Sequence, residues 1–157
     1  TDHFVQEWLD NVGEGVPGYV TPKIAIGAVV GNDDGDILLV QRRESGVWLY
    51  PTGWADVGYS PSEVAVKEVE EETGIICEPV RLLSVMYMLL FHCRATGGTL
   101  EGHPLETSDV GWFSEDALPE VTAGAQWWGP MAFAAIRGEP VEAGFDSPRS
   151  PVWRADS

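Results

Sequence analysis

The chain has 157 residues, 44% of them hydrophobic, and its 25 acidic and 9 basic side chains give a formal net charge of -16. This length fits a single domain with a substantial core, and the negative charge disfavours nucleic acid as a partner, because both would be polyanions. No segment approaches the 18 or more apolar residues of a membrane-spanning helix. We therefore expect a soluble, cytoplasmic protein that does not bind membranes.

The N-terminal segment has its own pattern. Apolar residues recur at helical spacing from Phe4 to Val12, and the Gly- and Pro-rich stretch 13–22 follows, which predicts a short amphipathic helix and a linker. We expect residues 1–20 to be a helical extension with its linker, 21–138 the main domain and 139–157 a polar tail. The apolar stripe has no partner within so short an extension, which predicts a homodimer.

Two strands and a turn are predicted next. The runs "KIAIGAVVG" and "DILLVQR" are typical of strands, and "NDDG" between them is a hairpin turn signal. The acidic residues of this turn could suggest calcium, but the rest of a binding loop is missing, so a plain turn is favoured. A short strand, "VWLY", then leads into the Gly-rich loop "PTGWADVGYSPSE".

The helix after this loop has clear start and stop signals. Ser60 suits the N-cap, Pro61 the first helical position, and Glu63 completes an S-x-x-E capping box. Gly74 suits the C-terminal end. We therefore expect a helix from Pro61 to about Thr73.

The segments after this helix have less clear secondary-structure signals. From Pro79 to Thr96 no Gly, Pro, Asn or Asp occurs after the first residue, which predicts either one long bent strand or a hairpin whose mobile loop residues are missing from the sequence. Further on, "VGWF" is typical of a strand and "AQWWGPMAFAAIRG" of a second helix. Cys77 and Cys93 are too few for a disulfide framework, and we expect buried free thiols. Strands mixed with two or three helices indicate an α/β or α+β fold.

The predicted helix sorts its charges by face. At about 100° per residue, Glu68, Glu71 and Glu72 fall within an arc of roughly 100°, whereas Glu70 points nearly opposite Glu68. Such carboxylates would raise one another's pKa unless cations neutralise them. The arc is therefore either a solvated face or a metal site. The Gly-rich loop before it, which lets backbone approach a ligand, favours a metal such as Mg²⁺.

The remaining helix positions follow the same sorting. The apolar stripe is expected to comprise Ala65, Val66, Val69 and Thr73. The opposite, solvated face is expected to comprise Glu63, Lys67 and Glu70. Glu63 and Lys67 are spaced for a favourable i,i+4 pair.

From Gly53, the stretch "GWADVGYSPSEVAVKEVEEETGI" resembles the Nudix hydrolase signature, G-x5-E-x7-R-E-U-x-E-E-x-G-U, where U is aliphatic. The resemblance implies a Nudix-type α/β/α sandwich with a mixed central sheet. The phrases "TPK" and "ETSDVGWF" also resemble a bacterial subgroup with a small helical N-terminal extension. Tyr59 stands where the family has Glu, and Lys67 where it has Arg. The family pairs these two positions to brace the loop on the helix, and we expect Glu63 to serve Lys67 instead.

The resemblance also implies a function. It is metal-dependent hydrolysis, with Mg²⁺ or Mn²⁺, of a diphosphate linkage in a nucleoside diphosphate derivative such as ADP-ribose, a CDP-alcohol or a nucleotide sugar. The alternative is a catalytically weak Nudix-fold module that binds or senses such a nucleotide. The implied metal ligands are Glu68, Glu72, the carbonyl of Gly53, Glu71 and Glu106. Glu71, Glu72 and Glu106 are the candidate catalytic residues, and Glu106 is otherwise a solvated loop residue.

The chemistry of the side chains suggests candidate substrate-binding residues. Arg42 and Arg43 end a predicted strand and could grip phosphate, although a surface charge is an equal alternative. Trp48, Trp54 and Tyr87 could stack on a base, and for each the alternative is a place in the core. Nothing in the sequence selects one nucleotide derivative.

Overall fold

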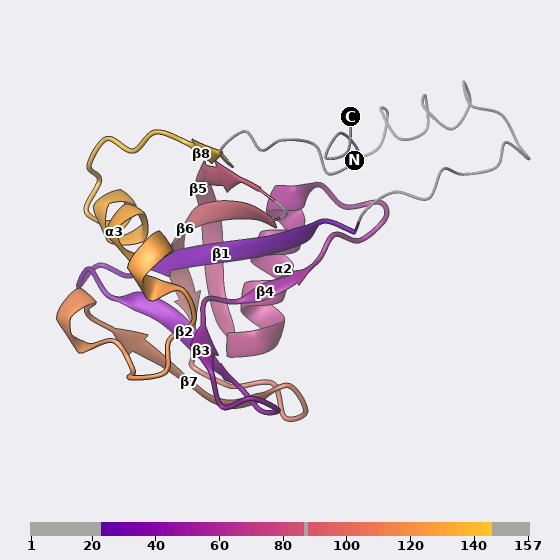
Figure 1. Ribbon diagram of the computed structural model, residues 1–157. Coiled ribbons are helices and arrows are strands. Elements are labelled where there is room, and N and C mark those ends of the chain that lie inside the picture. Colours follow the sequence, from indigo (N-terminus) through magenta and orange to yellow (C-terminus); the bar gives the residue numbers. More distant parts are fainter. Residues whose placement is uncertain (1–22, 87, 146–157) are drawn as a thin grey trace, which may run out of the picture.

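The computed structural model describes residues 23–86 and 88–145 (Figure 1). The predicted N-terminal helix and Tyr87 lie outside these residues. The described elements are, in chain order, β1 (Ala25–Gly31), β2 (Ile37–Arg42), β3 (Trp48–Leu49), β4 (Thr52–Trp54), α2 (Pro61–Thr73), β5 (Ile75–Val85), β6 (Met88–Gly98), β7 (Thr107–Phe113), the 3-10 helix η1 (Glu115–Ala117), α3 (Ala125–Ile136) and β8 (Gly144–Phe145). No helix among them is long and apolar enough to cross a membrane.

The strands form one mixed sheet in the order β3-β2-β1-β6-β5-β8, with β4 paired to β1 and β7 paired to β2. The central pair, β1 and β6, is parallel, whereas β5 and β6 are antiparallel. β1 and β2 pair only at the closed end of their hairpin, Gly31 with Ile37. Beyond it the strands separate, β4 takes the place beside Ala25–Gly27, and β7 accompanies β2. This split leaves room for a site between the two branches.

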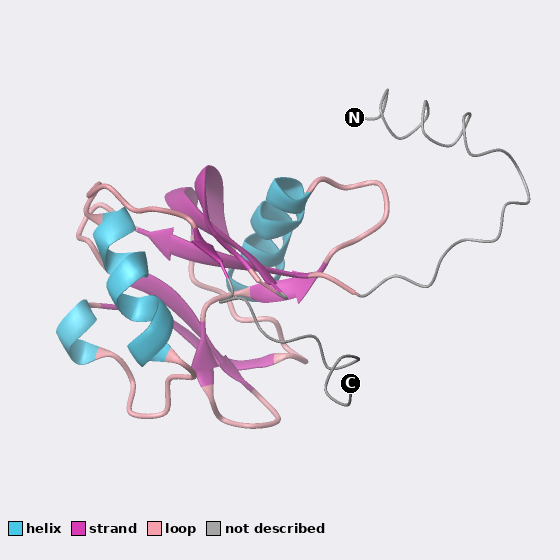
Figure 2. Cartoon of the chain, turned by 45° about the horizontal axis from the view of Figure 1, so that its top comes forward, coloured by secondary structure: helices cyan, strands magenta, loops and turns pink. Residues whose placement is uncertain are grey.

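A helix covers each face of the sheet, which confirms the predicted α/β/α sandwich (Figures 1 and 2). Because successive side chains of a strand point to opposite faces, β1 contributes to two cores. Ile26, Ala28 and Val30 join the core under α2, and Val29 joins the core under α3. The thiols of Cys77 and Cys93 are free and buried in the α2-side core, as expected.

The segment from Pro79 to Thr96 is a hairpin, the second of the two predicted alternatives. It is not one bent strand, because β5 and β6 form an antiparallel pair with Val85 opposite Leu89. The Met86 N–H donates to the Met88 carbonyl at 3.0 Å, so the chain reverses between these residues. The usual turn residues, Gly, Pro, Asn and Asp, are missing here. The sequence pattern therefore gave no signal for the position of this turn.

Helix α2 begins and ends where its signals predict. Ser60 Oγ accepts from the Glu63 N–H, the Glu63 carboxylate accepts from the Ser60 N–H, and Gly74 closes the helix at a positive φ of 71°. The predicted apolar stripe is partly wrong, since Val64 is fully buried and Val66 only partly. The inward face also includes Glu72, a carboxylate that is only 1% exposed.

Candidate active site

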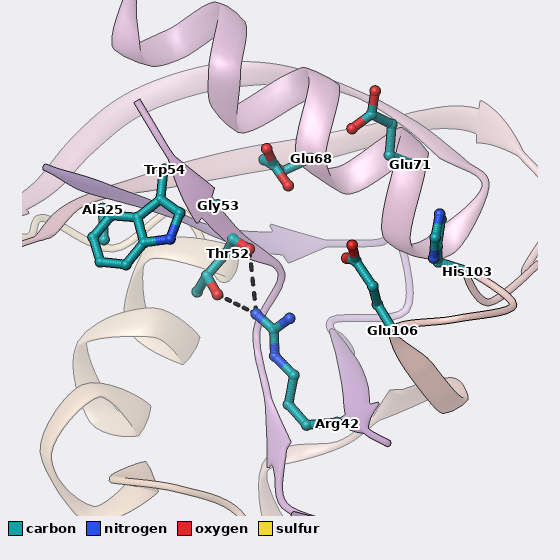
Figure 3. A pocket seen from close by; sticks show the side chains of 9 residues that line it. All are labelled: Ala25, Arg42, Thr52, Gly53, Trp54, Glu68, Glu71, His103 and Glu106. Atoms are coloured by element: carbon teal, nitrogen blue, oxygen red, sulfur yellow. Dashed lines mark hydrogen bonds between the residues drawn. The ribbon is translucent and has the colours of Figure 1, made fainter. Parts of the chain in front are cut away.

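A cavity of about 530 Å³ lies where β1, β4, α2 and the loop before β7 meet (Figure 3). Its lining residues are Ala25, Arg42, Thr52, Gly53, Trp54, Glu68, Glu71, His103 and Glu106. Most of the residues predicted from the sequence therefore meet at one place, although they come from segments up to 64 positions apart in the chain. The walls carry three carboxylates in a strongly acidic protein.

Glu72 lies directly behind this cavity and is held from two sides. Its Oε1 accepts from Arg42 Nη1 at 2.8 Å, and its Oε2 accepts from the Thr52 N–H at 3.1 Å. Arg42 also donates to the carbonyl and hydroxyl of Thr52. The guanidinium predicted to grip phosphate is thus engaged chiefly in orienting Glu72.

Burial dominates the electrostatics of Glu72. Removal from water raises the pKa of this carboxyl to about 7, although Arg42 and the Thr52 N–H oppose the rise. The negative charges of Glu68 and Glu106 raise it further. Arg42 therefore compensates the charge of this carboxylate only in part, and a second cation nearby would lower its pKa further.

Glu68 and Gly53 are in close approach. A Cβ placed on Gly53 would collide with the carboxylate of Glu68, so a side chain at this position would displace that carboxylate. Burial raises the pKa of Glu68, Lys67 opposes the rise, and the charges of Glu71, Asp56 and Glu106 add to it. Glycine thus allows the backbone of β4 to lie against the acidic face of α2.

Lys67 makes a different contact from the one expected. Its ammonium lies 3.2 Å from Asp56 and 3.3 Å from Glu71, whereas Glu63 is occupied by the capping box. The predicted Glu63–Lys67 pair is therefore wrong. Asp56 lies in the loop before the helix, so the Asp56–Lys67 pair joins loop to helix, as the family pair at positions 59 and 67 would.

The loop that carries Glu106 is fastened to the C-terminal end of α2. The N–H groups of Glu101 and His103 donate to the carbonyls of Thr73 and Glu72, at 2.7 and 3.2 Å. On its other side, the Arg43 N–H donates to the Glu106 carbonyl at 3.0 Å, at the end of the β2–β7 pairing. These bonds position Glu106 and His103 opposite the helix glutamates (Figure 3).

Two predicted substrate residues in the described part of the chain do not line the cavity. Arg43 turns aside and donates to the Thr107 carbonyl at 2.8 Å. Trp48 packs edge-to-face on Phe113, with ring centroids 5.0 Å apart, in the core under α3. Tyr87 lies outside the described residues. Trp54 does line the cavity, is 59% exposed, and has Lys23 Nζ 5.7 Å from its ring centroid.

Sequence reasoning missed Thr52, Asp56 and Lys23. Thr52 and Asp56 stand within the recognised loop, but no residue pattern identifies which loop position will meet Arg42 or Lys67. His103 lines the cavity with Glu71, and its position depends on the hydrogen bonds of its loop to α2.

The donor set suits a hard divalent cation. It combines carboxylates from α2 and the β7 loop with the backbone of Gly53, and such oxygen ligands are what Mg²⁺ prefers. Burial is the main cause of the raised pKa of both Glu68 and Glu72, and the negative charges of neighbouring carboxylates add to the rise. In residues 23–86 and 88–145, no three His, Cys, Asp or Glu side chains cluster tightly enough to hold an ion by themselves. An ion would therefore also need the Gly53 carbonyl, water or substrate oxygens.

Comparison with known proteins agrees with this geometry. The sequence of Bacillus subtilis (strain 168) YjhB, a protein provisionally named an ADP-ribose pyrophosphatase, is 33% identical over 130 residues, covering 74% of this chain and 62% of YjhB. The chain thus spans less than two thirds of that relative.

Solved structures show the same fold. An ADP-ribose pyrophosphatase from Streptococcus suis is 33% identical with a TM-score of 0.70, covering 80% of this chain and 100% of the other. The structure of a UDP-X diphosphatase is 26% identical with a TM-score of 0.72, covering 90% and 75%. The family model described as the NUDIX domain matches residues 21–132. The chain belongs to the Nudix hydrolase family.

Proposed function

We propose that this protein hydrolyses the diphosphate linkage of a nucleoside diphosphate derivative of the ADP-ribose type in a metal-dependent reaction. The observation that carries the proposal is the shared cavity in which Glu68, Glu71 and Glu106 face the glycine backbone of β4, with Glu72 behind them. Its size of about 530 Å³ is within the range of small-molecule sites.

Glu68, Glu71, Glu72, Glu106 and the carbonyl of Gly53 are the proposed ligands of Mg²⁺ or Mn²⁺. When bound, the metal would screen the charge of the diphosphate and lower the pKa of the attacking water. Glu72 retains lone pairs for this purpose, because each of its oxygens accepts only one hydrogen bond. Arg42 and Thr52 fix its orientation beforehand, and such fixed geometry favours catalysis.

Glu106 has two alternative proposed roles, as a metal ligand or, when it does not coordinate the metal, as the general base. Within the described residues its carboxylate makes no hydrogen bond or ion pair, so it can approach a water molecule in the cavity. It comes from the loop opposite α2 and can therefore act from the far side of the bound diphosphate (Figure 3). The Glu71 carboxylate accepts a hydrogen bond from Lys67, so it is less available to accept a proton.

Trp54 is the proposed platform for the base of the nucleotide. Its indole is exposed at the cavity edge, next in sequence to Gly53, and an exposed aromatic face offers a base a stacking surface. Lys23 beside this ring could meet the phosphates, since its ammonium makes no ion pair in the described part of the chain. The names of YjhB and of the Streptococcus suis protein support ADP-ribose as the first substrate to test.

The experiment is a screen of purified protein against ADP-ribose, a CDP-alcohol, a UDP-sugar and an oxidised nucleoside triphosphate, each with Mg²⁺, with Mn²⁺ and with chelator. Phosphate release after coupling to a phosphatase measures cleavage. We expect metal-dependent cleavage of ADP-ribose and a nucleoside monophosphate among the products. Tight binding of ADP-ribose without any cleavage would instead favour the nucleotide-sensing alternative.

A further inference from the structure

A second cavity, of about 330 Å³, lies at the opposite end of β1 from the candidate active site. Ala25 lines the first cavity and Gly31 the second, so the length of the strand, about 20 Å, separates them. The walls of the second cavity come from the turn after β1, from β5 and β6, and from the C-terminal end of α3. Its polar lining residues are Asn32, Asp33, Arg81, His92 and Arg94.

Strand alternation explains why basic groups gather here. On β6, Leu90 belongs to the core under α3, so His92 and Arg94 follow on the same face. Arg81 on β5 is paired directly with His92. The α3-facing side of the sheet therefore changes from apolar to basic near the C-terminal end of α3.

Arg81 stands out among the basic residues of the described chain. Arg42, Lys67, Arg94 and Arg137 form ion pairs with carboxylates. Within residues 23–86 and 88–145, Arg81 forms neither an ion pair nor a side-chain hydrogen bond, although it is half-buried. A guanidinium carries five N–H donors, so Arg81 can offer all of them to a ligand in the cavity.

His92 gives a second, independent sign. The residue is 7% exposed, and its Nδ1 has no hydrogen-bond partner among the described groups. A buried polar atom without a partner destabilises the fold, so a ligand that forms a hydrogen bond with it gains affinity. Burial, with help from the charge of Arg81, lowers the pKa of His92. The imidazole is therefore neutral at pH 7, and the positive charge of the cavity comes from the two guanidinium groups.

The carbonyls at the end of α3 do not account for these cations. The N–H groups of Arg137, Gly138 and Glu139 already donate to the carbonyls of Phe133, Ala135 and Ala134, at 2.9 to 3.0 Å. The helix end is satisfied by its own backbone. Arg81 thus faces the cavity without a structural partner there.

We propose that this second cavity is a binding site for the phosphate group of a small anionic ligand, held by the forks of Arg81 and Arg94 beside His92. A guanidinium matches phosphate bidentately, and two of them favour a dianion over a monovalent carboxylate. Arg94 already contacts Glu78, so a bound phosphate would share this arginine, and Arg81 is the principal anchor. Asp33 also lines the cavity, and its negative charge offsets part of the attraction of the arginines for an anion. The site is independent of the proposed hydrolysis.

The test is a titration of the full chain with inorganic phosphate, followed by NMR of the arginine Nε and histidine ring signals. It is done in chelator, since without metal the acidic cavity repels phosphate. We expect saturable shifts at Arg81 and His92, and acetate at equal ionic strength should bind at least about tenfold more weakly. Chemical shifts that change linearly with phosphate concentration without saturating, or that change equally with chloride, would show ionic screening in place of specific binding. Either result would overturn the proposal.

Two substitutions and a control complete the test. Arg81→Gln should weaken phosphate binding at least about tenfold, and Arg81→Lys, which keeps the charge but loses the fork, by a smaller factor. Arg137→Gln is the matched control, because Arg137 lies at the same end of α3 but is engaged by Glu115 and Glu139. It should leave the affinity within about twofold. Equal affinity of wild type and Arg81→Gln would refute the proposal.

Discussion

Replacing Glu72 by Gln should stabilise the metal-free protein at alkaline pH, even though it removes a proposed catalytic group. Burial raises the pKa of Glu72 from its ordinary 4.5 to about 7 in the folded state. Between these pH values Glu72 binds more protons in the folded protein than in the unfolded chain. The contribution of Glu72 to the free energy of unfolding is therefore highest below pH 4.5 and is lost as the pH rises through 7. The full difference between the two pKa values corresponds to about 3 kcal/mol of unfolding free energy.

Most of this loss lies between pH 5 and pH 8. We therefore expect the free energy of unfolding of the wild type to fall by about 2 to 3 kcal/mol more than that of Glu72→Gln over this range. The assay is urea unfolding in chelator at several pH values. Taking the difference between the two proteins cancels other titrating groups, such as Glu68 and His92, to the extent that the substitution leaves them unchanged.

Two comparisons sharpen this assay. Glu70→Gln removes the same charge from the exposed face of α2, so its pH profile should run parallel to that of the wild type. At pH 8, Mg²⁺ should stabilise the wild type and have little effect on Glu72→Gln, because a ligand that binds only the native state stabilises it. Parallel profiles for wild type and Glu72→Gln would refute the reasoning, since Glu72 would then ionise as an ordinary surface carboxyl.

Three further predictions concern the scaffold. Gly53→Ala should lower kcat at least about tenfold, because its Cβ would displace Glu68, whereas Gly97→Ala, with open space at that position, should leave kcat unchanged. Ser60→Ala should cost about 1 kcal/mol of unfolding free energy, measured with urea, because it removes the α2 cap. The predicted homodimer is checked by light scattering of the full chain, and a monomer at micromolar concentration, unaffected by deleting residues 1–14, would speak against it.

The sequence predicted most accurately what local chemistry determines. The limits of α2 follow from Ser60, Glu63 and Gly74, which act within one turn of the helix. The acidic arc follows from helical spacing, and Glu68 and Glu71 do line one cavity. Both features depend on neighbours within a few positions in the chain.

Features that depend on distant partners were not predictable in the same way. Arg42, at the end of β2, meets Glu72 of α2 across 30 residues, and this contact depends on the tertiary arrangement of the strand and the helix. Lys67 prefers Asp56 because the capping box already occupies Glu63. Trp48, on the short strand β3, belongs to the core because its ring packs against Phe113. In each case a tertiary contact outweighed a reasonable local alternative.

The most direct test of the central claim is kcat for cleavage of ADP-ribose, or of the best substrate from the screen, in four variants with saturating Mg²⁺. Glu71→Gln, Glu72→Gln and Glu106→Gln should each lower kcat at least about tenfold, equivalent to roughly 1.4 kcal/mol of transition-state stabilisation. Glu70→Gln changes the same charge on the opposite face of α2 and should leave kcat within about threefold. If Glu70→Gln proved as damaging as Glu72→Gln, the cavity that gathers the other glutamates would not be the catalytic site.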